Sequence, residues 1–280
     1  MPRYHLFEFN DQAWCPFRDT GLDMLRLLLN SGGHYNSIVP HLREGLNATR
    51  THTIVDLCSG GGGPWFSLTQ ELERVGLTPK VVLTDLFPNH EAFAAAAAAC
   101  PRIRSCPEPV DASAMPPELV GFRTLFTSFH HFRPNTARAI LADAVRNRAG
   151  IGIFEFTYRI PWLLALLLVV PSLIGIILIA PLMLFVMPFV RPVRFAPLFF
   201  TYVVPILPLL MPLIGVWDGA VSCLRTYTVA EMLEMAHSVS SAEPGRVDSY
   251  RWKAGTVPTA VYPYMPVSYL VGVPAEGKQF

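Results

Sequence analysis

TIVDLCSGGGG, residues 53–63, is the stretch of sequence that decides the fold. Residues 53–57 are apolar and rich in β-branched side chains, which predicts a buried strand of a parallel sheet. Glycines follow, and Pro64 stands where the first turn of a helix tolerates a missing N–H. WFSLTQELERVG, residues 65–76, then has helical spacing. Strand, glycine loop and helix form one α/β unit.

Strand and helix patterns continue to alternate along the chain. KVVLTDL is an apolar run that ends on an acid, and EAFAAAAAAC is a strong helix former. The alternation predicts an α/β fold, a Rossmann-like, doubly wound parallel sheet. Strands are expected at 52–57, 80–86, 103–110, 122–129, 150–157, 257–264 and 267–273, and helices at 20–30, 36–47, 65–76, 91–100, 134–147 and from 229.

The segments outside this alternation suggest three parts. Residues 1–50 form a helical cap, in which residues 5–18 are either a lid over the site or an arm packed on the surface. Residues 51–159 and 218–280 form the Rossmann-like domain, and Thr228 with Glu231 is a capping box that opens a helix in its second part. Residues 160–217 are an insertion before the last two strands.

The composition excludes some functions. The formal net charge of +1 does not indicate nucleic-acid binding, because proteins that bind nucleic acid present a strongly basic face. The cysteines number 5 and lack the paired spacing of a zinc site or a disulfide framework, so we expect reduced thiols and no metal. The sequence does not indicate an oligomeric state.

Asp56, Gly60 and Gly62 form the pattern D-L-x-x-G-x-G, and Asp85 ends the next strand. Here the chain resembles the class I S-adenosylmethionine-dependent methyltransferases, over about residues 50–158 and the last 50 or so. The resemblance implies S-adenosylmethionine as cofactor. Glycines allow the backbone to approach the ligand closely, and an acid after the second strand accepts hydrogen bonds from ribose hydroxyls. The resemblance also implies that Asp56 lies near the methionine part of the cofactor.

The resemblance extends to the ends of the third and fourth strands. Asp111 resembles the acid that contacts the adenine amine, and SFHHF, residues 128–132, the segment that lines the methyl-transfer site. The cofactor contacts that the resemblance implies are Asp56, Ser59, Gly60, Gly61, Gly62, Asp85, Leu86, Asp111, Ala112 and Ser128.

The glycine loop also departs from two patterns. Cys58 stands where the family usually has its first glycine. A dinucleotide-binding dehydrogenase of the type G-x-G-x-x-G needs a third glycine where Trp65 stands, which makes an NAD-dependent oxidoreductase a weaker alternative. A nucleotide-binding membrane protein without catalysis is the other alternative.

Methyl transfer from a sulfonium needs alignment, and a base only if the acceptor must lose a proton. His130 and His131 are the candidate bases, because imidazole titrates near neutrality and open α/β sheets bind ligands at this edge. Glu155 and Tyr158, near the end of the fifth strand, are further candidates. The alternative is that these side chains only pack or hydrogen-bond.

The insertion contains two uncharged stretches, residues 160–190 and 195–217, separated by Arg191 and Arg194. About 20 such residues can span a bilayer. Two full spans and a re-entrant hairpin both suit the pattern, and the third alternative is an apolar subdomain or dimer interface. We therefore expect a membrane-embedded insertion, a membrane location with the catalytic domain on the cytoplasmic side, and the lipid bilayer and a lipophilic small-molecule acceptor as partners.

Overall fold

The computed structural model describes residues 6–9, 11–12, 18–30, 32–165, 207–242, 250–259 and 266–275. The chain divides into two compact units. Unit 1 consists of Met1–Gly21 and Arg159–Arg225, and unit 2 of Leu22–Tyr158 and Thr226–Phe280. Unit 2 contains the glycine loop and the sheet.

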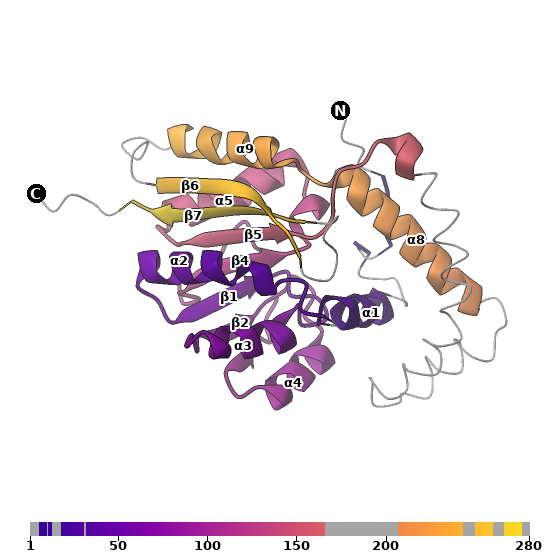
Figure 1. The fold of residues 1–280 in the computed structure, drawn as a ribbon, viewed down its shortest axis with the longest axis horizontal. Coiled ribbons are helices and arrows are strands. Elements are labelled where there is room, and N and C mark those ends of the chain that lie inside the picture. The colour runs from indigo at the N-terminus through magenta and orange to yellow at the C-terminus, as the bar shows by residue number, and fades with distance from the viewer. Residues whose placement is uncertain are drawn as a thin grey trace, which may run out of the picture. The chain divides into compact units, whose positions relative to one another are not determined.

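A single sheet in the strand order β3-β2-β1-β4-β5-β7-β6 is the centre of unit 2 (Figure 1). Strands β1 to β5 are parallel to one another, and β7 is antiparallel to both β5 and β6. The strands are β1 (Thr53–Leu57), β2 (Lys80–Leu83), β3 (Ile103–Ser105), β4 (Phe122–Phe126), β5 (Ile151–Glu155), β6 (Tyr250–Val257) and β7 (Val267–Pro274).

The predicted parallel sheet is therefore mixed, and one predicted strand is misplaced. We expected the next-to-last strand at 257–264, but β6 ends at Val257. Residues 260–265 lie outside the described part of the chain. Only nine residues, 258–266, connect β6 to β7, and a parallel connection needs a crossover of a dozen residues or more. An antiparallel hairpin is the arrangement that so short a connection permits.

The helices begin and end close to the predicted positions. Thr228 caps α9 as expected, because Glu231 N–H donates to its hydroxyl (3.3 Å) while the Glu231 carboxylate accepts from Thr228 N–H (2.9 Å). The helices are α1 (Arg18–Asn30), α2 (Val39–Thr49), α3 (Trp65–Arg74), α4 (His90–Ala99), α5 (Pro134–Arg146), α8 (Leu207–Arg225) and α9 (Val229–Ala242), and the 3-10 turns are η1 (Asn36–Ile38) and η2 (Phe129–His131).

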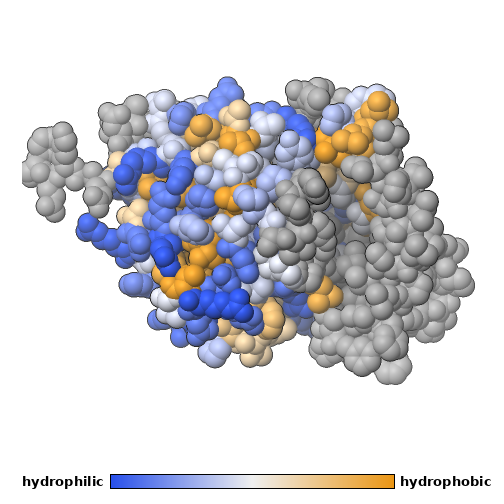
Figure 2. Space-filling model, viewed as in Figure 1, coloured by the Kyte–Doolittle hydropathy of each residue, from blue (hydrophilic) through white to orange (hydrophobic). Residues whose placement is uncertain are grey.

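Two hydrophobic cores lie on opposite faces of the sheet. Successive strand residues point to opposite faces, so Ile54 packs with α2, α3 and α4, whereas Val55 packs with α5 and α9. Trp65 of α3 and Phe129 of η2 are fully buried, one in each core. On the face shown in Figure 2, hydrophilic residues and small apolar groups are interspersed over unit 2. Because helices cover both faces of the sheet, unit 2 is a three-layer α/β/α arrangement.

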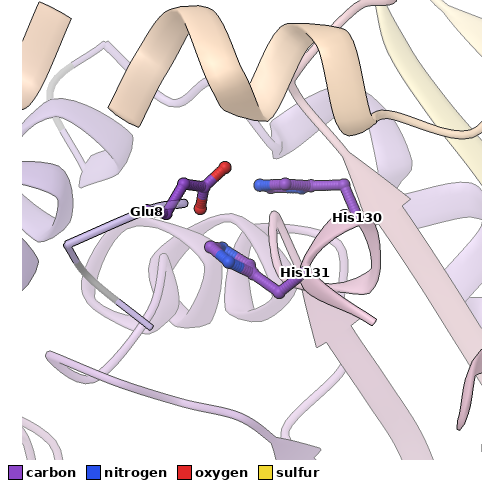
Figure 3. Close-up of side chains that lie close together, drawn as sticks. All are labelled: Glu8, His130 and His131. Atoms are coloured by element: carbon purple, nitrogen blue, oxygen red, sulfur yellow. The ribbon is translucent and has the colours of Figure 1, made fainter. Parts of the chain in front are cut away.

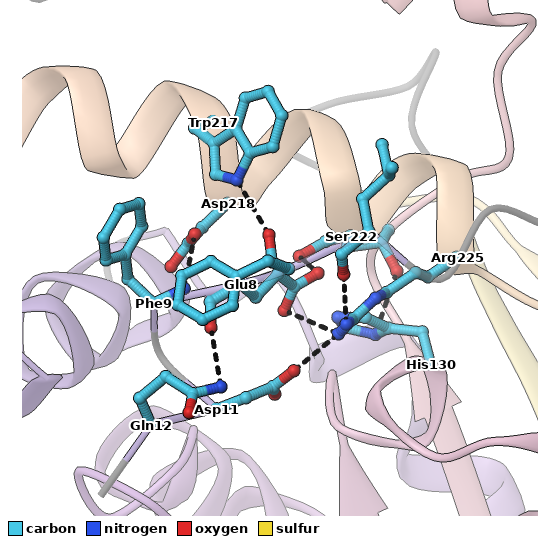
Figure 4. Close-up of polar contacts among 12 residues, drawn as sticks. Glu8, Phe9, Asp11, Gln12, His130, Trp217, Asp218, Ser222 and Arg225 are labelled. Atoms are coloured by element: carbon cyan, nitrogen blue, oxygen red, sulfur yellow. Dashed lines mark hydrogen bonds and ion pairs between the residues drawn. The ribbon is translucent and has the colours of Figure 1, made fainter. Parts of the chain in front are cut away.

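In unit 1, the N-terminal segment lies against the C-terminal half of α8 (Figure 4). Trp217 Nε1 donates to the carbonyl of Phe7 (2.8 Å), and Arg225 forms ion pairs with Asp11 (2.7 Å) and the buried Glu8 (3.4 Å). Residues 6–12 are therefore held to α8 by polar contacts.

The membrane prediction is wrong. Within the described ranges, no helix combines the length and the apolar character that a membrane span requires. The second uncharged stretch runs into α8, and this helix continues to Asp218 and Arg225, which bind the N-terminal segment. No inserted apolar hairpin is shown among the described residues, and residues 166–206 of the predicted insertion lie outside them. The described residues therefore contradict the predicted membrane location with a cytoplasmic catalytic domain.

Candidate active site

The candidate site lies at the carboxyl ends of the parallel strands in unit 2. Strand β1 pairs with β2 on one side and β4 on the other, so the chain reverses its winding direction between β1 and β4. Open α/β sheets bind ligands outside the carboxyl ends of the strands at this switch point. The glycine loop follows β1 and the histidine segment follows β4, so the topology brings both to one edge.

The glycine loop takes up backbone conformations that favour glycine. Gly60, Gly62 and Gly63 have φ values of +51°, +101° and +60°. Cys58, the residue that departs from the family pattern, has φ +56° and thus adopts the left-handed conformation that a glycine takes at little cost. Burial raises the pKa of its thiol, which keeps the group neutral beside nearby carboxylates. Cys58 thus places a neutral thiol at a position whose backbone conformation favours glycine.

Helix α1 packs directly on the glycine loop. A Cβ atom added to Gly61 would lie 2.7 Å from the carbonyl oxygen of Leu22. The Asn30 side chain donates to the carbonyl of Gly63 (2.9 Å) and accepts from the N–H of Ser67 (2.9 Å) in the first turn of α3. Helix α1 is thereby fixed both to the glycine loop and to α3.

Asp56, at the end of β1, is a buried carboxyl group within a hydrogen-bond network. Its Oδ2 accepts from the hydroxyl of Ser59 (2.7 Å) and its Oδ1 from that of Thr124 on β4 (2.7 Å). Burial raises its pKa to about 6, against the opposing effect of these hydroxyl donors. The group therefore ties β1, the loop and β4 together at the carboxyl edge.

Asp85, two residues beyond β2, binds the backbone with both carboxylate oxygens. Oδ2 accepts from Gly60 N–H (2.8 Å), and Oδ1 accepts from Phe87 N–H (2.9 Å). The carboxylate thus connects the glycine loop to the turn after β2. The neighbouring Leu86 and Phe87 are each 47% exposed, which leaves apolar surface beside the acid.

The segment after β3 reaches the same edge. Val110 N–H donates to the backbone carbonyl of Asp85 (2.9 Å). Asp111 is exposed and accepts from both the backbone N–H and the hydroxyl of Ser113 (2.8 and 2.7 Å), while Ala112 is buried. The structure thus places Asp85 and Asp111 on two loops that are joined by a backbone hydrogen bond.

Ser128, two residues beyond β4, has a buried hydroxyl. The residue is 7% exposed, and within the described part of the chain its Oγ has no hydrogen-bond partner. A buried polar atom without a partner costs free energy unless a ligand or water completes it. This hydroxyl thus lacks a hydrogen bond that a bound molecule or water would have to supply.

His130 and Glu155 form a fully buried pair, and each is 1% exposed. His130 Nδ1 lies 2.7 Å from Glu155 Oε2, and Glu155 Oε1 accepts from Phe129 N–H (2.7 Å). Although burial disfavours the ionised form, the adjacent His130 ring and the donors lower the pKa of Glu155. A carboxylate that accepts from Nδ1–H fixes the tautomer, so that Nε2 carries the lone pair of the neutral ring.

His131 lies beside His130 at the end of β4 (Figure 3). The two ring centroids are 4.2 Å apart, and the rings are tilted by 34°. His131 is half-buried. Of the three predicted catalytic residues, the structure joins His130 and Glu155 in one pair and places His131 against it.

Thr127 shapes the turn between β4 and the histidines, a role that the sequence did not indicate. This β-branched residue has φ +45°, a conformation that is an outlier for its type. Its Oγ1 hydrogen-bonds to the hydroxyl of the buried Tyr35 and accepts from Phe156 N–H (3.4 Å). A β-branched residue at a strand end is ordinary in sequence, and only the backbone angle distinguishes it.

Comparisons with known proteins support the fold. No protein family model matches this chain, and no curated protein matches it. Among solved structures, that of the plantazolicin methyltransferase BpumL in complex with SAH is similar with a TM-score of 0.53 at 9% identity, covering 93% of this chain and 91% of that one.

Two further structures are similar over 95% of this chain. The structure of LepI in complex with SAM has a TM-score of 0.51 at 17% identity, and that of the O-methyltransferase NcsB1, solved with S-adenosylmethionine and 2-hydroxy-5-methyl naphthoic acid, has a TM-score of 0.50 at 13% identity. This chain spans 55% of the length of LepI and 61% of that of NcsB1. At these identities the likeness shows the fold: a class I S-adenosylmethionine-dependent methyltransferase fold with a mixed, seven-stranded sheet.

Proposed function

We propose that this chain is an S-adenosylmethionine-dependent methyltransferase in which His130 removes a proton from a hydroxyl group of a small-molecule acceptor. The observation that carries the proposal is the buried His130–Glu155 pair, which lies at the same edge of the sheet as the glycine loop. Solved structures of the same fold contain SAM or SAH, which supports the choice of cofactor.

The residues at the edge fit that cofactor. The loop Gly60–Gly63 has no side chains, so its backbone allows close approach by a ligand; Gly60, Gly61 and Gly62 are buried, and Leu22 of α1 lies against Gly61. We assign Asp85, just after β2, to the ribose hydroxyls, and Asp111, exposed on the adjoining loop, to the adenine amine. Ser128 contributes a buried hydroxyl that lacks a partner in the described part of the chain. These groups, with Asp56 towards the methionine part, would hold the cofactor.

His130 is suited to act as a general base. The cofactor, when bound, supplies a methyl group on a sulfonium that is already activated for transfer. With the Glu155 carboxylate on Nδ1–H, Nε2 is the ring nitrogen that we assign to accept the proton of the acceptor hydroxyl. The positive charge that then develops on the ring is stabilised by the Glu155 carboxylate, which the surrounding donors keep ionised.

The acceptor class is part of the proposal. A group that must lose a proton before methylation, such as a phenol, needs the base that this pair provides. Tyr158, three residues after Glu155, is 52% exposed and presents an aromatic ring close in sequence to the end of β5. A lipophilic acceptor of this kind is part of the proposal.

Two measurements on the full chain test the proposal. Calorimetry with S-adenosylmethionine should show binding, and NAD should give none; the opposite result would favour an oxidoreductase. With a panel of phenolic acceptors, the enzyme should then form SAH. Binding without SAH formation on any acceptor would favour a nucleotide-binding protein without methyltransferase activity.

The His130→Asn variant tests the base. Because general base catalysis contributes roughly 10²- to 10⁴-fold, kcat should fall by that factor while SAH affinity stays within about twofold. His237→Asn, an exposed histidine on α9, is the matched control and should leave kcat unchanged. Unchanged kcat in His130→Asn would refute the assigned base.

A further inference from the structure

Thr157 and Thr226 lie on either side of the segment that leaves unit 2. The chain leaves this unit after Tyr158 and returns at Thr226, so that residues 158–225 separate the two threonines. The hydroxyl of Thr226 donates to the hydroxyl of Thr157 at 2.6 Å, and Thr226 is 1% exposed. We call this hydrogen-bonded pair of threonines the neck.

The neck leads directly to the buried pair at the strand ends. Thr157 Oγ1 donates to Glu155 Oε2 at 3.0 Å. Glu155 Oε2 in turn lies 2.7 Å from His130 Nδ1. Glu155 Oε1 is occupied by Phe129 N–H at 2.7 Å. A continuous row of hydrogen bonds therefore runs from Thr226 through Thr157 and Glu155 to His130.

The direction of these hydrogen bonds determines what the neck can do. Because Thr226 donates to Thr157, the Thr157 hydroxyl proton is directed at the carboxylate and not back towards Thr226. A hydroxyl that both accepts and donates is a stronger donor than an isolated one, since successive hydrogen bonds polarise each other. The Thr157 hydroxyl thus holds Oε2 in the position at which it meets His130 Nδ1.

We propose that Thr157 and Thr226 are positioning residues for the His130–Glu155 pair: the neck joins the two points at which the chain leaves and re-enters unit 2 and fixes the carboxylate that orients the imidazole. The inference rests on the proposed function for its catalytic meaning, since orienting His130 matters to catalysis only if His130 is the base. Its structural content is independent of the cofactor.

The test follows the Nδ1 proton of His130 by NMR of the full chain with 15N-labelled histidine, at one fixed pH. His130→Asn assigns the signal, because this variant lacks it. Thr157→Val removes a hydrogen bond to a charged group, so exchange of the Nδ1 proton with water should become roughly ten- to hundredfold faster. Thr226→Val removes a hydrogen bond between neutral groups, and the expected increase is roughly two- to tenfold.

Conservative and control variants separate positioning from a general loss of stability. Thr157→Ser and Thr226→Ser keep the hydroxyls and should exchange within about twofold of the unmodified protein. Thr69→Val is the matched control: Thr69 is also buried, but its hydroxyl donates to the carbonyl of Trp65 within α3 (2.6 Å), so this variant should leave the His130 signal unchanged.

The outcomes are distinct. An increase in exchange that is larger in Thr157→Val than in Thr226→Val, with recovery in the serine variants, supports the proposal. Equal exchange in all variants, slower exchange in Thr157→Val, or the same increase in Thr69→Val would overturn it. Calorimetry with SAH on the same proteins distinguishes the two proposals. If none of them binds SAH, the proposed function is refuted, and the NMR result still tests whether the neck positions Glu155 and His130.

Discussion

Replacing Asp56 by Asn should shift the difference in unfolding free energy in favour of the variant as the pH rises. Asp56 is 1% exposed, and burial raises its pKa from 3.8 to about 6. Between these values the folded protein binds a proton that the unfolded chain has already released. Since the folded state binds more protons in this window, the free energy of unfolding falls as the pH rises through it.

The magnitude follows from the two pKa values. A difference of this size corresponds to a loss of about 3 kcal/mol in the free energy of unfolding once the carboxyl group is ionised in both states. Roughly half of the loss, about 1.5 kcal/mol, develops between pH 5 and pH 8. Asn has nearly the same shape and does not titrate, so Asp56→Asn should escape this loss.

Urea denaturation of both proteins at pH 5 and pH 8 measures the effect. The difference in unfolding free energy between Asp56→Asn and the unmodified protein should increase by about 1.5 kcal/mol in favour of the variant from pH 5 to pH 8. All other titrating groups are common to the two proteins and cancel. A difference that stays constant, or that changes in the opposite direction, would refute a buried Asp56 with a raised pKa.

Two further substitutions probe the glycine loop and the acid beside it. Asp85→Ala should weaken binding of S-adenosylmethionine roughly ten- to hundredfold in calorimetry, because the carboxylate accepts from Gly60 N–H and is the group that we propose for the ribose; unchanged affinity would remove this assigned role. Gly61→Ala should lower the free energy of unfolding by about 1 to 3 kcal/mol, measured by urea denaturation, because its Cβ would lie 2.7 Å from the Leu22 carbonyl oxygen; an equally stable variant would show that α1 does not pack on the loop as described.

Local patterns were sufficient to predict most of the sheet. The strand at residues 53–57 and the glycines after it are one continuous signal, and β1 begins and ends where expected. Strand β6 was missed because RWKAG, residues 251–255, alternates charged, aromatic and small side chains at the edge of the sheet, where little apolar surface is buried. The apolar run after it, from residue 257, was the stronger local signal and was misleading.

The membrane prediction failed for a related reason. Hydropathy reports how apolar a stretch is, but not which helix it joins. Residues 207–217 belong to α8, which continues to Arg225, and there the ion pairs with Glu8 and Asp11 hold the N-terminal segment. The partners of these charges lie more than 200 positions away in the sequence, so no local window contains both.

The sequence placed the candidate residues at one edge of the sheet, but it did not predict their arrangement there. His130 and Glu155 were both candidates because each follows a strand of the sheet, yet their pairing depends on how the chain turns after β4. In the turn, Thr127 N–H donates to the carbonyl of Phe154 on the neighbouring strand (2.9 Å). The sequence shows which residues follow each strand, but the pairing of this turn with β5 determines which of their side chains meet.

The turn itself is held by a residue far from the histidines. The left-handed conformation of Thr127 costs about 1 to 2 kcal/mol, and each hydrogen bond that its hydroxyl makes returns about 0.5 to 1.5 kcal/mol. One partner is Phe156 N–H and the other is the hydroxyl of Tyr35, whose pKa burial raises, so that it stays protonated and can donate. Two hydrogen bonds therefore offset the strain. The orientation of His130 is thus determined jointly by the strand end that carries it and by a tyrosine from the segment before β1.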